Sequence, residues 1–275
     1  MNYRHIYHAG NFADVFKHIT LIALAQSLLR KEAGFCYLDT HAGVGHYDLT
    51  SSYAQKNKEF ESGIQKIFSE KNPPALITEY LNCIKELNPQ DKLTIYPGSP
   101  YFVRCLLRPQ DRMVLSELHE DDYLTLKKFF GRDKRVAIHH LNGYQGLKAF
   151  LPPKERRGLV LIDPPYEKPD EFTKLTSILP QAIEHWDTGV YALWYPIKER
   201  RATDRLIQKL KSKISRPTLT AELSIYPENI HTSLNGSGMM IVNPPWQLDK
   251  ELNELLPWLW KRLSVEGQGR FSLSI

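Results

Sequence analysis

Cysteine is scarce in this sequence, and the marks of a secreted, membrane-spanning or metal-binding protein are missing. Only 3 of the 275 residues are cysteines, and because Cys36, Cys83 and Cys105 are odd in number and widely spaced, a disulfide framework and a zinc site are both disfavoured. No apolar run approaches the roughly 20 residues of a membrane span, and the polar start lacks the apolar segment of a signal peptide. The 10 histidines show no metal-ligand spacing. We therefore expect a cytoplasmic protein without a metal site.

Charge of either sign is not strongly in excess. The 36 Lys and Arg residues outnumber the 31 Asp and Glu residues by five, a net charge of +5 at pH 7. This balance is compatible with nucleic acid as a partner but does not require one. The contents of 42% hydrophobic and 24% charged residues are those of an ordinary globular protein. The length fits one large domain with an insertion, or two small domains.

Short apolar runs alternate with segments of helical period, as a parallel α/β sheet requires. Before the first run, apolar residues recur with helical spacing after Asp14, and Gly34 is expected to end that helix. The runs predict strands at residues 35–38, 113–116, 136–139, 159–162, 190–194, 219–223 and 239–242. The pattern predicts an α/β fold with a mostly parallel, seven-stranded sheet.

The segment between the first two predicted strands is too long for one crossover helix. Two helices are expected in it, at residues 59–70 and 75–87. Because connections in such sheets typically have about 2 to 6 residues, we interpret residues 47–95 as an inserted helical subdomain, with residues 1–46 and 96–275 forming the main domain. The crossover helix is then expected to begin at Ser99-Pro100, with serine as its cap and proline at its first position.

The most informative motif is Asp163-Pro164-Pro165-Tyr166, which directly follows the apolar run at residues 159–162. Neither proline can donate a hydrogen bond to a neighbouring strand, so the strand ends here, where ligands collect in an open α/β sheet. Asp163 and the Pro164 carbonyl could accept both hydrogens of an exocyclic amine and aim its lone pair at a sulfonium methyl group. Tyr166 would stack on a flipped-out base. The alternative is a proline-rich turn with a helix-capping aspartate.

A nucleoside cofactor could bind along the same edge of the sheet. The first strand ends in residues 39–45, a turn in which Gly43 lets the backbone approach a ligand. Glu117 closes the second strand, where a carboxylate can accept hydrogen bonds from two ribose hydroxyls. Asn142-Gly143 could meet an adenine edge, and the helix start at Ser99 suits the carboxylate of methionine. Each feature also has a plain structural explanation, as a tight turn, a solvated strand-end carboxylate or a helix cap.

In this order the motifs resemble those of class I S-adenosylmethionine-dependent methyltransferases of the adenine-N6 group, which have a Rossmann-like fold. The resemblance is sharpest near the start, where Tyr3-Arg4-His5 and residues 8–18 are similar to the opening motif of the bacterial 23S ribosomal RNA adenine-N6 methyltransferase family RlmJ. Other similar segments lie at residues 39–43, 96–100, 157–159, 163–166, 191–196 and 243–246. The likeness covers essentially the whole chain.

The resemblance implies methylation of the N6 amine of one adenine in 23S ribosomal RNA, adenine 2030 in the family. The cofactor would be S-adenosylmethionine, the substrate naked RNA or an early assembly particle, and the enzyme a monomer. Asp163, Pro164 and Tyr166 would be catalytic, and Tyr3, His5 and Tyr166 would lie against the substrate. The implied cofactor contacts are Lys17, His18, His41, Gly43, Ser99, Glu117, Asn142, Gly143 and Asp163. The chain departs from the family at Asn142, where Asp is common; Asn can also accept a hydrogen bond from the adenine amine.

Two further features have a structural and a functional interpretation. Asn243-Pro244-Pro245-Trp246 also looks like a methyltransferase signature, but it follows the last strands, whereas Asp163 follows the fourth strand at the switch in strand order. We interpret the second tetrapeptide as structural. A second feature, a basic residue at every fourth position, predicts either a helical stripe that follows a phosphate backbone or a solvated helix face. Its members are Arg201, Arg205, Lys209 and Lys213.

The sequence leaves two other functions open. One is methylation of a different nitrogen, such as guanine N2, DNA adenine or a glutamine side chain. The other is RNA binding by an inactive methyltransferase fold. The intact glycine turn, Glu117 and Asp163 favour an active enzyme, and a lack of cofactor binding would favour the inactive fold.

Overall fold

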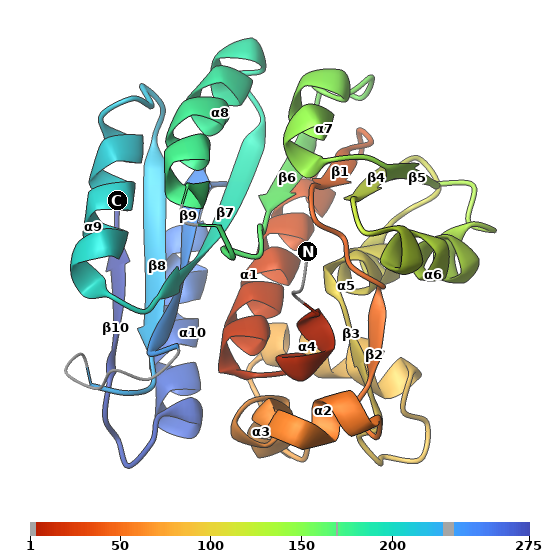
Figure 1. Cartoon of the computed structure of the whole chain (residues 1–275), viewed down its shortest axis with the longest axis vertical. Helices are drawn as coiled ribbons and strands as arrows, with labels where there is room; N and C mark the ends of the chain where they lie inside the picture. The colour runs from red at the N-terminus through yellow and green to blue at the C-terminus, as the bar shows by residue number, and fades with distance from the viewer. Residues whose placement is uncertain (1–3, 169, 228–233) are drawn as a thin grey trace.

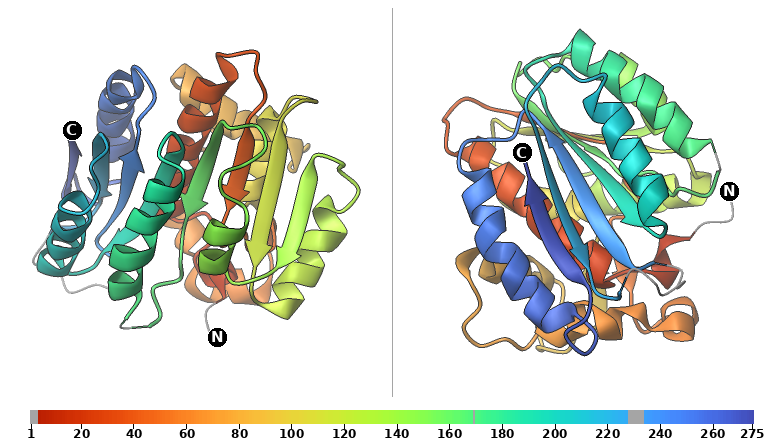
Figure 2. Two further views of the ribbon diagram at one scale, coloured as in Figure 1. Left: turned by 90° about the horizontal axis from the view of Figure 1, so that it is seen from above. Right: turned by 90° about the vertical axis from the view of Figure 1, so that its left-hand side faces the viewer.

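A twisted sheet with helices on both faces forms the centre of the molecule (Figures 1 and 2). The structure is a computed structural model that describes residues 4–168, 170–227 and 234–275. Within these residues the large sheet has eight strands in the order β10-β8-β9-β7-β6-β1-β4-β5. The parallel strands are β1 (Cys36–Asp39), β4 (Arg112–Glu117), β5 (Val136–His140), β6 (Gly158–Ile162) and β7 (Val190–Ile197). The antiparallel strands are β8 (Thr218–Ser224), β9 (Gly236–Val242) and β10 (Arg270–Ser274).

The fold class predicted from the sequence is confirmed, with one strand more than the seven expected. All seven apolar runs form strands of this sheet. The eighth, β10, pairs with β8 at the edge of the sheet, and its residues are mostly exposed. Because an exposed edge strand needs few apolar residues, the segment at residues 270–274 carries no strong apolar run.

The two faces of the sheet bury two separate apolar clusters, because successive side chains of a strand point to opposite sides. In β6, Leu159 and Leu161 join the cluster on one face and Val160 and Ile162 the cluster on the other. The second face is covered by α7 (Gly143–Ala149), α8 (Glu171–His185) and α9 (Arg200–Lys211). This two-sided burial explains why the β6 sequence is continuously aliphatic.

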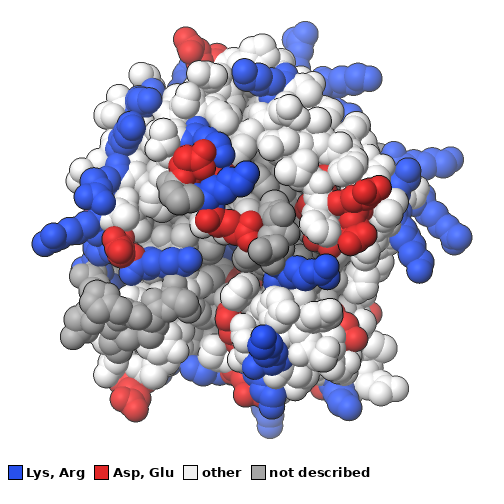
Figure 3. All heavy atoms as spheres, viewed as in Figure 1, with Lys and Arg blue, Asp and Glu red and all other residues white. Residues whose placement is uncertain are grey.

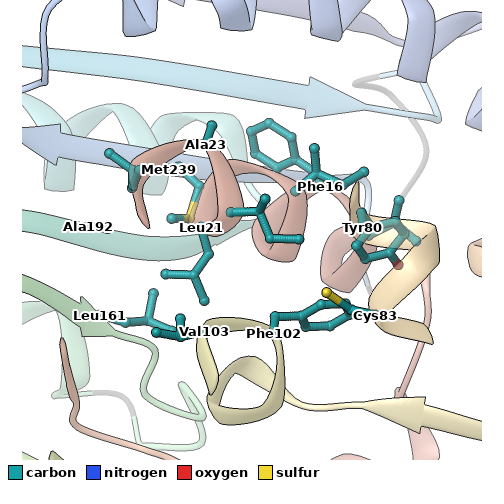
Figure 4. Packing of buried hydrophobic residues seen from close by; sticks show 14 of the residues in the cluster. Phe16, Leu21, Ala23, Tyr80, Cys83, Phe102, Val103, Leu161, Ala192 and Met239 are labelled. Atoms are coloured by element: carbon teal, nitrogen blue, oxygen red, sulfur yellow. The ribbon is translucent and has the colours of Figure 1, made fainter. Parts of the chain in front are cut away.

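The helix α1 (Phe12–Leu29) is the core element on the first face. It packs against the sheet, α4 (Ala75–Glu86), α5 (Ser99–Leu106) and α10 (Leu248–Leu263). Figure 4 shows Phe16 and Leu21 among side chains of α4, α5 and the sheet. Of the helices in the described residues, only α1 is long and apolar enough to cross a membrane, and 83% of that window is buried inside the protein. Its apolar character therefore serves the core. Asn11 caps its start, and it ends before Gly34, at Leu29.

Residues 47–95 form several short elements that pack onto α1. The ribbon of β2 (His46–Asp48) and β3 (Ile95–Pro97) encloses α2 (Ser52–Asn57), η2 (Glu59–Ser62), α3 (Ile64–Ile67) and α4. The helix expected at residues 59–70 is interrupted at Gly63, where a Cβ atom would lie 2.1 Å from the Gly10 carbonyl oxygen. Phe60 and Tyr80 belong to the same apolar cluster as α1. The division into a main domain and an inserted subdomain stays a prediction.

The strand order changes direction between β1 and β6. From β1 the chain moves outward to β4 and β5, and then returns to β6 on the other side of β1. Asp39 at the end of β1 is in register with Leu161 of β6, so Asp163 follows at the same edge. Ligands of open α/β sheets bind at such a point, and the sequence prediction for Asp163 is confirmed in its placement.

Candidate active site

A cleft of about 1030 Å³ lies at the carboxyl ends of the parallel strands. This volume is enough for a nucleoside cofactor together with a base, because ligand pockets usually measure about 300 to 1,000 Å³. Tyr3 lies outside the described residues. Every other site residue predicted from the sequence lines the cleft, namely His5, Lys17, His18, His41, Gly43, Ser99, Glu117, Asn142, Gly143, Asp163, Pro164 and Tyr166. In the part of the chain that the structure describes, no group of three or more His, Cys, Asp or Glu side chains is arranged to hold a metal ion.

Lys17 connects α1 to the Asp-Pro-Pro-Tyr turn. Its Nζ donates to Asp163 Oδ2 at 2.6 Å, lies 2.9 Å from Asp14 Oδ1, and is 5.5 Å from the centre of the Trp194 ring. Burial alone would lower the pKa of this ammonium group, but the two carboxylates outweigh it and raise the pKa above its ordinary value. Lys17 therefore carries a positive charge that fixes Asp163.

Asp14 is the carboxylate that holds Lys17 from the other side. It also accepts hydrogen bonds from His5 Nε2 at 2.8 Å and from the Gly10 N–H at 3.0 Å. Burial would raise the pKa of Asp14, but the charges of His5 and Lys17 hold it well below its ordinary value. Asp14 thus joins the N-terminal segment to Lys17 and, through it, to Asp163.

His18 lies one residue further along α1 and is committed to the core. Its Nδ1 is 2.8 Å from the Tyr96 hydroxyl, and its ring centre is 4.8 Å from that of Phe102. Burial lowers the pKa of His18 well below its ordinary value, so the ring is neutral. One ring nitrogen is therefore engaged by the protein, although the side chain still lines the cleft.

Ser99 does not cap its helix, which corrects the sequence interpretation. The residue before α5 is Gly98, without a side-chain cap, and the Ser99 hydroxyl donates to Asp39 Oδ2 at 2.7 Å. Asp39 also accepts from the Tyr37 hydroxyl at 2.7 Å and the His41 N–H at 3.2 Å. A hydrogen bond to an ionised acceptor is roughly twice as strong as a neutral one, which explains the choice of partner. Burial raises the pKa of Asp39 to about 6.

Glu117 and Gly43 are hydrogen-bonded to each other across the turn at residues 39–45. Glu117 Oε2 accepts from the Gly43 N–H at 2.9 Å, and Oε1 accepts from the His119 N–H at 2.7 Å. Gly43 has φ +62°, and a Cβ atom there would lie 2.4 Å from the Tyr47 hydroxyl, so any other residue would be strained. Burial raises the pKa of Glu117. Each carboxylate oxygen keeps a second lone pair, which suits two ligand hydroxyls.

Asn142 and Gly143 form the start of α7 beside the same turn. The Asn142 Oδ1 atom caps the helix by accepting from the Tyr144 N–H at 2.9 Å. A Cβ atom on Gly143 would lie 2.0 Å from the Thr40 carbonyl oxygen, so only glycine permits this approach. His41 packs with its ring centre 5.4 Å from that of Tyr144, and burial lowers its pKa to about 4. His41 is therefore neutral at physiological pH.

Tyr166 is held rigidly at the end of the Asp-Pro-Pro-Tyr turn. Its backbone has φ +52°, a left-handed conformation that is uncommon for a bulky residue and found most often at functional sites. Its hydroxyl donates to the Trp194 carbonyl oxygen, and its ring centre lies 5.5 Å from that of Phe172. The helix that follows, α8, begins at Glu171 with Asp170 before it. The alternative role of Asp163 as a helix cap is therefore wrong.

The second tetrapeptide lies at the opposite end of the sheet. Because β9 is antiparallel to β7, Val242 at the end of β9 is in register with Tyr191 near the start of β7. The Asn243 side-chain amide donates to the carbonyl oxygens of Asp187 at 2.8 Å and Gly189 at 2.7 Å. This supports the structural interpretation for a reason the sequence did not give: β9 is an inner strand of reversed direction.

Three contributors to the site were not singled out from the sequence. Asp14 lies three residues before Lys17, a spacing that places both on one helix face and could have indicated it. Trp194 supplies the carbonyl that holds Tyr166 and a ring near Lys17. Glu59 binds both His8, at 2.8 Å, and Asn11, at 2.9 Å. Both Glu59 contacts join residues that are at least 48 positions apart in the chain, so no local pattern indicates them.

Comparison with known proteins identifies the family. Residues 32–274 match the family model described as ribosomal RNA large subunit methyltransferase D, RlmJ. The chain belongs to the RlmJ family. It is 42% identical over 274 residues to the Escherichia coli (strain K12) protein named ribosomal RNA large subunit methyltransferase J, covering 100% of this chain and 98% of that protein.

A second named relative and a solved structure agree with this assignment. The protein of the same name from Haemophilus influenzae is 43% identical over 274 residues, covering 99% of this chain and 98% of that protein. A crystal structure of a Legionella pneumophila protein superposes with a TM-score of 0.89 at 38% sequence identity, covering 97% of both chains. The resemblance found in the sequence is thus confirmed, and the fold is shared over nearly the full length.

Proposed function

We propose that this member of the RlmJ family transfers the methyl group of S-adenosylmethionine to the N6 amine of an adenine in 23S ribosomal RNA. Two relatives named as ribosomal RNA large subunit methyltransferases, matched along nearly their whole length, support the reaction and the class of RNA. The observation that carries the proposal is the Lys17–Asp163 contact of 2.6 Å at the end of β6. It fixes a carboxylate acceptor beside Pro164 and Tyr166, at the point where a ligand binds this fold.

The cofactor fits the strand ends of β1, β4 and β5. The free lone pairs of Glu117 suit the two ribose hydroxyls, and the glycine backbone at Gly43 permits close approach. The oxygen of Asn142 caps α7 and keeps a second lone pair for the adenine amine, while its two amide hydrogens can donate to a ring nitrogen of adenine. The methionine part of the cofactor would then lie near the carboxyl ends of β1 and β6. The residues proposed to contact it there include Lys17, Ser99 and His41. When bound, the cofactor supplies an electrophilic methyl group.

The target base would bind against the Asp-Pro-Pro-Tyr turn. Asp163 Oδ2 accepts from Lys17, which leaves Oδ1 to accept one amine hydrogen while the Pro164 carbonyl accepts the other. So held, the amine nitrogen would face the methyl group that the cofactor supplies; the new nitrogen–carbon bond would replace the carbon–sulfur bond, and the surplus proton would pass to water. Tyr166, held by Trp194, offers a fixed plane for stacking, which contributes about 1 to 3 kcal/mol per base.

The N-terminal segment is proposed to cover this pocket. His5 lines the cleft and is tied to Asp14, so Tyr3 and His5 would lie against the flipped base. We also propose that the protein acts as a cytoplasmic monomer on naked 23S RNA or an early assembly particle. Because adenine in an intact RNA duplex is inaccessible, the target adenine would be unpaired or flipped out.

Asp163 and Asn243 provide a matched test. Tritiated methyl transfer to a 23S RNA fragment should fall at least about 100-fold in Asp163→Ala, because one positioned group at a reacting centre contributes about that much. Asn243→Ala should keep most of its activity per folded molecule. Nucleoside mass spectrometry of the product should identify N6-methyladenosine. A methylated guanine, DNA or protein would favour the alternative methyltransferases, and cofactor binding without any transfer would favour an inactive fold.

A further inference from the structure

A row of cations leads from the edge of the cleft along α9. Lys198 lines the cleft and is exposed. Two residues further the chain enters α9, on which Arg201, Arg205 and Lys209 are all exposed. Figure 3 shows Lys and Arg side chains gathered along the margin of the molecule where α9 lies. We call Arg201, Arg205 and Lys209 the α9 row.

The charges of the α9 row are not neutralised by the protein. None of its three side chains forms an ion pair or hydrogen bond with a residue in the described ranges. The neighbouring Arg200, by contrast, pairs with Asp204 at 2.7 Å and also with Glu222. Thr203, Leu206 and Leu210 anchor the opposite side of the helix in the core. The row is therefore presented to solvent on a firmly packed helix.

Lys213 does not belong to the row, which corrects the four-member stripe expected from the sequence. It lies beyond the end of α9 at Lys211, and its Nζ donates to the Thr176 carbonyl oxygen at 2.8 Å. Lys213 therefore fastens the end of α9 to α8. The first and last of the remaining three cations are eight residues apart, or about 12 Å at a helical rise of about 1.5 Å per residue.

We propose that Lys198 and the α9 row bind the phosphates of the RNA strand that flanks the flipped adenine. This inference rests on the proposed function, because it requires RNA at the cleft. A base in the cleft places the backbone of its own strand at the cleft edge, and Lys198 is the lining cation that lies nearest to α9 along the chain. The α9 row continues from there at a spacing that can contact several successive phosphates. Neutralising phosphates with Lys and Arg releases counterions, which gives a favourable and salt-dependent contribution to binding.

A second group of cations, on α6 (Glu120–Phe130) and the turn after it, provides a matched control. Lys127, Lys128 and Arg132 are exposed, and Figure 1 shows α6 on the side of the molecule opposite α9. The first turn of α6 carries Glu120, Asp121 and Asp122, whereas α9 carries one acid, Asp204. Replacing either set of three with alanine lowers the net charge from +5 to +2. The two variants therefore lose the same number of positive charges at different places on the molecule.

The test compares the wild type with Arg201→Ala/Arg205→Ala/Lys209→Ala and with Lys127→Ala/Lys128→Ala/Arg132→Ala. Binding of a 23S RNA fragment is measured over a series of salt concentrations. For single-stranded nucleic acid each phosphate contact contributes about 0.7 to the slope of log K against log salt, so the α9 variant should show a slope shallower by about 2. Its KM for RNA should rise at low salt, with a much smaller change in kcat. Cofactor affinity should not change, and the α6 variant should follow the wild type.

Equal slopes in the α9 variant and the wild type, or equal losses in both variants, would overturn the inference. In the first case RNA does not touch α9, and in the second only the net charge matters. Failure of the proposed function is a different result, in which the wild type itself transfers no methyl group to RNA. If the alanine variant does not fold, as judged by thermal unfolding, Arg201→Gln/Arg205→Gln/Lys209→Gln repeats the test with longer side chains.

Discussion

Replacing Lys17 with methionine tests whether the Asp14–Lys17–Asp163 network organises the site. Methionine has a similar length and keeps contact with Trp194, but it removes the charge between two carboxylates. The side chains of Lys17 and Asp14 are only 5% and 3% exposed. Removing one partner of a buried ion pair typically costs about 3 to 5 kcal/mol, because the other charge stays buried without compensation. We expect Lys17→Met to lower the free energy of unfolding by about this amount.

A double-mutant cycle distinguishes the network from a general packing defect. Asp14→Asn removes the buried charge that Lys17→Met leaves behind. The double variant should therefore lose less free energy of unfolding than the two single variants lose in sum. Contacting residues usually give a coupling energy of about 0.5 to 3 kcal/mol. Methyl transfer should stay low in every variant that lacks Lys17, since Asp163 has lost the donor that fixes it.

The measurements are denaturant unfolding and methyl transfer on the same four proteins. The raised pKa of Lys17 gives stability that is complete below its ordinary value of 10.5 and is lost as pH rises through the folded value. The lowered pKa of Asp14 gives stability that is present above 3.8 and is lost as pH falls through the folded value. The difference between wild type and Lys17→Met should therefore be flat between about pH 5 and 9. Additive effects in the cycle, or a loss below about 1 kcal/mol, would refute the network.

Three further predictions concern the rest of the site. Glu117→Ala should weaken cofactor binding about 10- to 100-fold in calorimetry, because hydrogen bonds to a charged acceptor contribute about 1.5 to 3 kcal/mol; equal affinities would remove Glu117 from the site. Because the pKa of Asp39 is raised to about 6 in the folded protein, Asp39 contributes stability that is complete below pH 3.8 and is lost as pH rises through 6. Because the pKa of His41 is lowered to about 4, His41 contributes stability that is complete above pH 6.5 and is lost as pH falls through 4. Thermal unfolding from pH 4 to 7 should therefore shift in opposite directions in Asp39→Asn and His41→Gln relative to the wild type, and parallel shifts would contradict these assignments. Deleting residues 1–7 should depress RNA methylation strongly and cofactor affinity much less, as measured by transfer and titration of one protein; undiminished transfer would leave the terminus without a role.

The sequence by itself determined the features that depend on neighbouring residues. Four aliphatic residues followed by two prolines specify a buried strand and its end, so β6 and the position of Asp163 could be predicted. Glycine is favoured where φ is positive or where two backbones approach closely, which made Gly43 and Gly143 recognisable within their turns. The N-terminal motif carried the family, because a long segment of matched residue types is far more specific than a tetrapeptide.

Only the tertiary structure decided which distant groups meet. Ser99 was a plausible helix cap until the fold placed its hydroxyl beside the buried Asp39. The direction of β9, not the residues of its tetrapeptide, put Asn243 at the far end of the sheet. Lys213 matched the period of the α9 row, yet it bonds to α8. In each case the choice between two acceptable partners depends on strand order and helix placement, which are set by burial summed over the whole core and cannot be read from a local pattern.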